Sequence, residues 1–276
     1  MDYIIIIYIV FGLLPSLAWL SYYLRKDAHP EPKRMILKIF LWGALMTLPV
    51  FIIETGLAKV IDIVLAWLNF PQINCVQFCT TPYLDYLTGL SLNNLGGLSF
   101  IILLIYWFLT ISFVEEFFKY LVIKIKVINS PHLDEPLDVM LYMVVAALGF
   151  AAVENVLYLF GLPGQMSFNK LIDSTLFVDC IRFVGAVFLH TLCSAVIGYC
   201  LAMSFYEVKL RKLWLVVGIT IATVLHGLYD FSIMTIHGYY YIEGFIIPAV
   251  IILILAFFVF SGFTRLKNMK SICKIK

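Results

Sequence analysis

Residues 98–123 read LSFIILLIYWFLTISFVEEFFKYLVI, an apolar run that carries two adjacent glutamates, Glu115 and Glu116, and one lysine, Lys119. A helix needs about 20 mostly apolar residues to cross the roughly 30 Å hydrocarbon core of a bilayer. Charged side chains inside such a helix are costly, and they are kept where they pair with one another or perform a function. The stretch therefore predicts a membrane-spanning helix that contributes to a buried polar site.

The whole chain has the same apolar character. Its residues are 63% hydrophobic and 13% charged, and its mean hydropathy is +1.00, whereas a soluble domain is about half apolar and a quarter charged. Apolar runs separated by short polar segments predict an all-α, polytopic membrane helix bundle. We expect about seven transmembrane helices, near residues 3–24, 35–57, 98–123, 137–160, 180–205, 213–235 and 242–263.

No linker or soluble domain separates these runs, so residues 1–276 are expected to form a single integral membrane domain of a multi-pass protein of the cell membrane. The first run lacks a basic region before it and predicts a retained helix rather than a signal peptide. Residues 58–97 are interpreted as an amphipathic segment followed by an extracytoplasmic cap. Cys75 and Cys79 lie in this cap, either as a local disulfide or as two thiols. No basic patch supports nucleic-acid binding.

The positions of lysine and arginine predict the orientation, because cytoplasmic loops carry the excess of these residues. The chain has 19 of them, and nearly all follow the first, third, fifth and seventh predicted spans. The exceptions are Lys59, Lys170 and Arg182. Seven spans with the N-terminus outside and the C-terminus in the cytoplasm fit this distribution, and an eighth span would not.

The glutamate pair is the first candidate for chemistry. On a helix, Glu115 and Lys119 share a face and can form an ion pair, whereas Glu116 points about 100° away. An ion pair that only stabilises the helix end is one interpretation. The second carboxylate raises the cost of burial, however, and favours a general base for activating water.

Two further spans carry ionisable groups. Glu154 and Asn155 lie among small residues that permit close helix packing, and Glu154 alone could serve only as a hydrogen-bonding partner for a neighbouring helix. Arg182 and His190 are separated by a little over two turns and can therefore face one side of their helix. A single membrane histidine is as compatible with an interhelical hydrogen bond as with catalysis.

His226 and Asp230 complete the set, at a spacing of four residues that places both on one face. Unpaired ionisable groups on four spans would each cost several kcal/mol unless they converge on a polar cavity. Helical rise places this cavity between the midplane and the outer leaflet. Other ionisable residues lie near predicted loops and are expected at the solvated surface: Asp62, His132, Asp173, Asp179, His237 and Glu243.

Together these motifs resemble the PrsW family of intramembrane proteases, which are related to the CAAX-processing and bacteriocin-processing membrane endopeptidases. The resemblance covers most of the chain and includes the loop DAHPEPKR at residues 27–34. It implies that the protein is an intramembrane endopeptidase. The expected substrate is a membrane-anchored, single-span protein in the bilayer, such as an anti-sigma factor, cut near its extracytoplasmic side.

The required chemistry assigns a role to each candidate residue. One of Glu115 and Glu116, helped by His190, is expected to activate the water. His226, oriented by Asp230, is expected to stabilise the oxyanion. The supporting positions of the catalytic site are Lys119, Glu154, Asn155, Arg182 and Asp230.

A metal-dependent version uses nearly the same side chains. Glu154, His190 and His226 could present one carboxylate and two imidazoles to Zn²⁺. The sequence has no HExxH motif. We favour the metal-free form, which requires no cofactor, and leave zinc open.

Two other functions fit a buried polar cluster. In a proton- or cation-coupled transporter the same acids and histidines would line an ion path, but such transporters are often built from paired halves with broken helices, and no internal repeat is visible. A seven-helix receptor would use the cluster only to bind a ligand, and it leaves the adjacent glutamates without a task.

Overall fold

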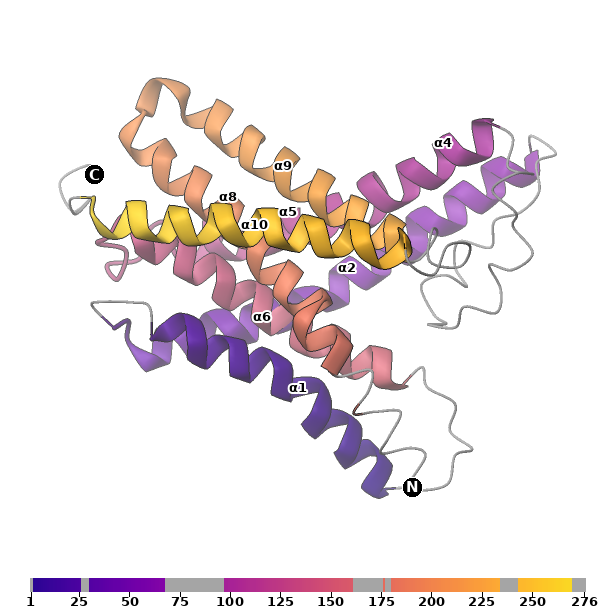
Figure 1. The fold of residues 1–276 in the computed structure, drawn as a ribbon, viewed down its shortest axis with the longest axis horizontal. Helices are drawn as coiled ribbons and strands as arrows, with labels where there is room; N and C mark the ends of the chain where they lie inside the picture. The colour runs from indigo at the N-terminus through magenta and orange to yellow at the C-terminus, as the bar shows by residue number, and fades with distance from the viewer. Residues whose placement is uncertain are drawn as a thin grey trace.

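The computed structural model describes residues 2–25, 30–67, 97–160, 176, 180–233 and 243–269, and the elements within these ranges are helical (Figure 1). The α-helices are α1 (Asp2–Leu24), α2 (Lys33–Trp67), α4 (Gly97–Ile105), α5 (Phe113–Lys126), α6 (Pro136–Phe160), α8 (Ala186–Tyr206), α9 (Arg211–Phe231) and α10 (Glu243–Lys267). A π-helix, η3 (Tyr106–Ser112), joins α4 to α5, and a 3₁₀ turn, η4 (Val208–Leu210), precedes α9.

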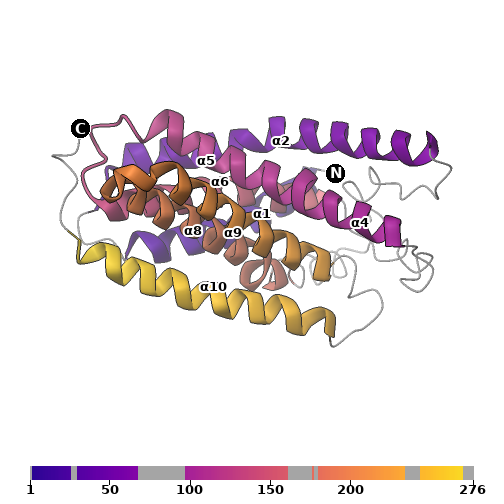
Figure 2. The same cartoon turned by 90° about the horizontal axis from the view of Figure 1, so that it is seen from above.

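Six helices in the described ranges are long and apolar enough to cross a membrane by length and composition. They correspond to the first five predicted spans and to the last one. The remaining predicted span, residues 213–235, is the 21-residue helix α9, which is not among those six. The start of α1 and the end of α10 lie at opposite ends of the bundle in both views (Figures 1 and 2). The helical, multi-pass fold is confirmed, and the orientation stays a prediction.

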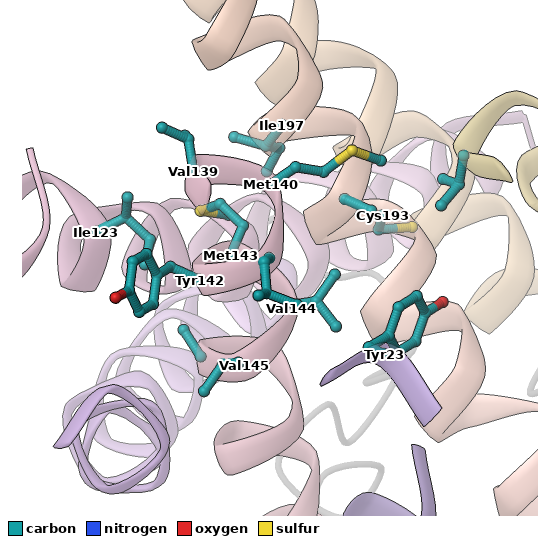
Figure 3. Packing of buried hydrophobic residues seen from close by; sticks show 14 of the residues in the cluster. Tyr23, Ile123, Val139, Met140, Tyr142, Met143, Val144, Val145, Cys193 and Ile197 are labelled. Carbon is teal, nitrogen blue, oxygen red and sulfur yellow. The ribbon is translucent and has the colours of Figure 1, made fainter. Parts of the chain in front are cut away.

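Helix α6 forms the centre of the bundle. Its side chains are buried from Pro136 to Ala152, and it packs against α1, α2, α5, α8 and α10. Figure 3 shows Met143 and Val144 of α6 among Ile123 of α5, Cys193 of α8 and Tyr23 of α1. Small residues such as Ala146 and Gly149 let neighbouring helices approach α6 closely, which suits this helix to the centre.

Glycines allow α2 and α6 to approach closely. A Cβ atom added at Gly43 would overlap the backbone carbonyl of Ala146, and one added at Gly149 would overlap the carbonyl of Phe40. Small residues at such contacts let membrane helices pack backbone to backbone. The expected close packing around residue 149 is therefore confirmed, and it brings α2 beside the helix that carries Glu154.

Gly149→Ala is expected to destabilise the protein by about 1–3 kcal/mol, because the added methyl group meets backbone that cannot rotate away. Gly56→Ala on α2 is the matched control, since a Cβ there meets nothing within 4 Å among the described residues. Thermal unfolding in detergent should show a lower midpoint for Gly149→Ala alone. Equal midpoints for the two variants would contradict the close contact.

The segment predicted to be amphipathic continues α2 without a break as far as Trp67. Its inner residues Ala58 and Leu65 pack against Leu103, Tyr106 and neighbouring side chains of the α4–η3 region. The long α2 and α4 thus support each other at one end of the bundle (Figure 1). The predicted cap with Cys75 and Cys79 lies outside the described residues.

The span that carries the glutamate pair is not one continuous α-helix. The π-helix η3 ends at Ser112, and the Ser112 hydroxyl donates to the carbonyl of Trp107, five residues earlier, at 2.8 Å. Short π-helical segments occur frequently at functional sites. Helix α9 packs closely against η3 at Gly227. A Cβ added there would lie 3.0 Å from the Phe108 ring and 3.2 Å from Ser112 Oγ. The contact places His226 beside the start of α5.

Candidate active site

Lys119 lies at the centre of the buried cluster. Its Nζ is 3.0 Å from Glu115 Oε2 and 2.8 Å from Glu116 Oε1. Glu116 was expected to point away from the face that Glu115 and Lys119 share, but it contacts this lysine as well, because residues three and four positions apart both reach one side chain on a helix. The Lys119 side chain is fully buried, and its Nζ lies 4.4 Å from the centre of the Phe150 ring. One ammonium therefore holds both carboxylates.

His190 connects Lys119 to the next helix. Its Nδ1 is 2.9 Å from Lys119 Nζ, and its Nε2 is 2.6 Å from Glu154 Oε2. An ammonium group only donates hydrogen bonds, so Nδ1 accepts from Lys119 and Nε2 donates to Glu154. Both ring nitrogens are thus occupied within the cluster.

Arg182 closes the side of the cluster formed by α6. Its Nη2 donates to Glu154 Oε1 at 2.7 Å, and its Nε donates to Asn155 Oδ1 at 2.5 Å. A guanidinium group has no acceptor, so the amide oxygen of Asn155 must face it. The amide nitrogen of Asn155 is buried and has no hydrogen-bond partner within the part of the chain that the structure describes. It is a free donor at the edge of the site.

His226 enters from α9. Its Nδ1 is 3.0 Å from Glu116 Oε1, and its Nε2 is 3.3 Å from Asp230 Oδ2. The two imidazole rings of His190 and His226 lie edge to face, 5.0 Å apart. Ser194 of α8 donates to Glu116 Oε2 at 3.1 Å. Four helices and the segment before α8 therefore build one connected network.

The structure brings together every residue that the sequence predicted for the site. The glutamate pair and both histidines are buried, whereas the side chains of Glu154 and Asp230 are 33% and 22% exposed. Among the residues expected at the surface, His132 is exposed, and Asp62 lies within α2 and is half-buried. Asp173, Asp179, His237 and the Glu243 side chain lie outside the described residues. Among these residues, the partly exposed side of the polar site is therefore that of Glu154 and Asp230.

Three residues of the site region were missed in the sequence analysis. Ser194 and Phe150 are ordinary residues of a helix interior, and only their tertiary contacts with Glu116 and Lys119 reveal them. Glu54 is an acid in the middle of the second predicted span, and it falls on the helix face that is elsewhere buried. An acidic residue on the buried face of a predicted span was the signal that could have identified Glu54 from the sequence.

A divalent cation would find suitable ligands here. One ligand atom from each of four buried side chains lies within 4.8 Å of the others: Glu115, Glu116, His190 and His226. This group contains both predicted histidine ligands, but the glutamate pair replaces Glu154, whose oxygens are engaged by Arg182 and His190. Lys119 Nζ contacts three of these four residues. The donor set fits a metal only if the ammonium moves.

A polytopic helical membrane protein with buried carboxylates and imidazoles, and with a partly exposed edge to that cluster, has the features of an intramembrane hydrolase. Residues 31–262 match the family described as PrsW family intramembrane metalloprotease. The match covers most of the chain, so the protein belongs to this family.

Curated relatives agree with this assignment. The chain is 28% identical over 232 residues to "Protease PrsW" of Bacillus subtilis (strain 168), a match that covers 83% of this chain and 84% of the relative. It is 26% identical to "Protease PrsW" of Geobacillus kaustophilus (strain HTA426), covering 83% and 81% of the two chains. The protein of the same name from Clostridioides difficile (strain 630) is 26% identical, with 81% and 77% covered.

No solved structure matches the chain. The family and its relatives nevertheless show that the protein is an intramembrane protease and a multi-pass membrane protein. They do not favour the transporter, the main alternative from the sequence.

Proposed function

We propose that the protein hydrolyses a peptide bond of a membrane-anchored, single-span protein, such as an anti-sigma factor, near its extracytoplasmic side. The partial exposure of Glu154 and Asp230 supports entry of substrate and water from that end, because both residues lie toward the predicted extracytoplasmic ends of their helices. The observation that carries the proposal is the convergence of Glu115, Glu116 and His226 around buried polar contacts.

Glu115 is the better candidate for the general base. Both oxygens of Glu116 accept hydrogen bonds, from Lys119 and His226 on one side and from Ser194 on the other, and its side chain is fully buried. Glu115 is 7% exposed, and only its Oε2 is in contact with Lys119. A base must reach the proton it removes. Glu116 therefore acts as a positioning residue that holds Lys119 and His226.

His226 is suited to stabilise the oxyanion. Its Nε2 makes the longer of the two ring contacts, 3.3 Å to Asp230, and can turn to a substrate oxygen while Nδ1 stays on Glu116. Preorganised donors in a site shielded from water are a large part of catalysis in acyl transfer. The amide nitrogen of Asn155, which has no partner among the described residues, is a second donor for the substrate carbonyl. His190 holds Lys119 and Glu154 in place.

A metal remains the alternative within the same reaction. Glu115, Glu116, His190 and His226 would hold the cation, which would supply Lewis acidity to the water and the scissile carbonyl. The specific observation in favour of the metal-free form is Lys119, which already supplies a cation to both glutamates.

The test is cleavage in proteoliposomes that contain the purified protein and single-span candidate substrates, anti-sigma factors among them. Wild type should release a fragment cut near the extracytoplasmic end of the substrate span, and His226→Ala should lower the rate by about 10²–10³-fold while remaining folded. Cleavage at the wild-type rate by His226→Ala would refute the proposed site.

Chelation separates the two mechanisms. The metal-free form predicts that EDTA or 1,10-phenanthroline leaves the rate unchanged, since Lys119 and not an exchangeable ion neutralises the glutamates. Rates and bound metal are measured together on the same preparation. Loss of activity on chelation, with recovery on adding Zn²⁺, would decide for the metal.

A further inference from the structure

Glu54 lies on the face of α2 that turns toward the protein interior. The buried residues of this helix include Gly43, Thr47, Val50 and Ala58, which follow the helical period. Glu54 is one turn after Val50 and one turn before Ala58, so it belongs to the same stripe. The apolar side chains at 48, 52 and 63 are exposed and cover the opposite face. Glu54 itself is half-buried, and its place on this stripe turns it toward the protein.

The surroundings of Glu54 are those of the active site. Val50 packs with Val114 of α5, which directly precedes the glutamate pair. It also packs with Phe150 of α6, whose ring lies over Lys119 Nζ. Ile53, which precedes Glu54 in the chain, packs into the same cluster, together with Phe118 of α5. Through Glu54, α2 thus contributes one wall of the buried cluster.

The Glu54 carboxyl is incompletely paired. Its Oε1 is shielded from solvent and has no hydrogen-bond partner within the described ranges. A buried polar oxygen without a partner is costly, and leucine would fit among the mostly apolar residues of this part of α2. Natural proteins break local rules of this kind mainly at functional sites. A partner that the described part of the chain does not supply would explain why the acid is present.

We propose that Glu54 binds the main chain of the substrate, accepting a hydrogen bond from a backbone N–H group next to the scissile bond. The inference rests on the proposed function. A transmembrane substrate must leave its helix before cleavage, and each residue that unwinds releases an N–H group that lipid cannot satisfy. An acceptor on the wall of the site stabilises that extended segment. Glu54 is then a substrate-binding residue, while Glu115 retains the role of base.

Two substitutions test this role. Glu54→Leu removes the acceptor, and Glu54→Gln keeps an acceptor oxygen without the charge. Glu54→Leu is expected to raise KM for the single-span substrate about three- to tenfold with a smaller change in kcat, since one hydrogen bond is lost. Glu54→Gln should stay within about twofold of wild type by the same reasoning. Asp62→Leu, two turns further along α2, is the matched control and should cleave normally.

Thermal stability provides a readout that does not depend on cleavage. Glu54→Leu should unfold at the same temperature as wild type or a few degrees higher, because an unpaired buried oxygen is removed. A lower unfolding temperature would show that Glu54 is a structural residue. If Glu54→Gln and Glu54→Leu lost cleavage equally, the Glu54 carboxyl would transfer a proton instead of binding the substrate. Either result would overturn the inference.

The two proposals fail in different ways. If wild type cleaves no single-span protein, the proposed function fails, and the unfolding temperatures still decide whether Glu54 is a structural residue. If wild type cleaves and Glu54→Leu has an unchanged KM, the proposed function stands and the inference on Glu54 is wrong. A Glu115→Gln background permits a binding measurement with the intact substrate, because turnover does not intervene. Adding Glu54→Leu to that background should weaken the affinity for this substrate about three- to tenfold.

Discussion

Glu115→Gln is expected to lower the rate of peptide cleavage by about 10²–10⁴-fold, the usual contribution of a general base. The amide keeps the size of the side chain but cannot take the proton from water. The loss should fall on kcat, because the substrate segment still meets His226 and Glu54. Initial rates in proteoliposomes at several substrate concentrations measure the effect.

Glu116→Gln provides the comparison that identifies the base. Glu116 is fully buried and bonded through both oxygens, so its amide variant is expected to lose thermal stability as well as activity. Glu115→Gln should lose activity with a smaller change in stability, because its carboxyl makes fewer contacts. Glu207→Gln, on an exposed residue, is the control for the substitution itself. If Glu115→Gln cleaved normally while Glu116→Gln were folded and inactive, the roles would be reversed.

Lys119→Met is expected to destabilise the fold by about 3–5 kcal/mol and to abolish cleavage. Methionine fills a similar volume but leaves Glu115 and Glu116 buried without their shared cation, and breaking a buried ion pair costs that much. Lys124→Met on the exposed face of the same helix should change stability by less than about 0.5 kcal/mol. Unfolding curves in detergent measure both values.

Two additions sharpen the Lys119 experiment. Glu116→Gln combined with Lys119→Met should recover part of the lost stability, because one of the two uncompensated charges is gone. Zn²⁺ should raise the unfolding temperature of Lys119→Met more than that of wild type, since three of the four potential ligands lose the ammonium group that they contact. A Lys119→Met variant as stable as wild type would show that the ammonium does not hold the glutamate pair.

Much of the site was readable from the sequence because burying charge in a membrane is expensive. Glu115, Glu154, His190 and His226 fall inside apolar runs, and the cost of keeping them there predicts convergence whatever the packing. The spacing of four residues likewise predicted that His226 and Asp230 would face each other, and their side chains lie 3.3 Å apart. Glu54 was equally readable by this reasoning and was missed.

The partners within the cluster were not readable, because helical spacing describes one helix at a time. Lys119 reaches both glutamates within α5, but it reaches His190 only once α5 and α8 are packed together. The π-helix before Glu115 depends on hydrogen bonds that shift by one residue, which an apolar pattern does not record.

The sequence by itself determined that this protein is a polytopic helical membrane protein with ionisable groups gathered in its interior, because hydropathy and the cost of buried charge act at every position independently. The tertiary structure alone decided that Lys119 occupies the centre of the cluster, that Glu116 is more tightly held than Glu115, and that Glu54 has an oxygen with no partner in the described residues. These facts depend on which helices touch and how closely. Glycines such as Gly43 and Gly149 make the contacts close, and their effect is visible only when both helices are in place.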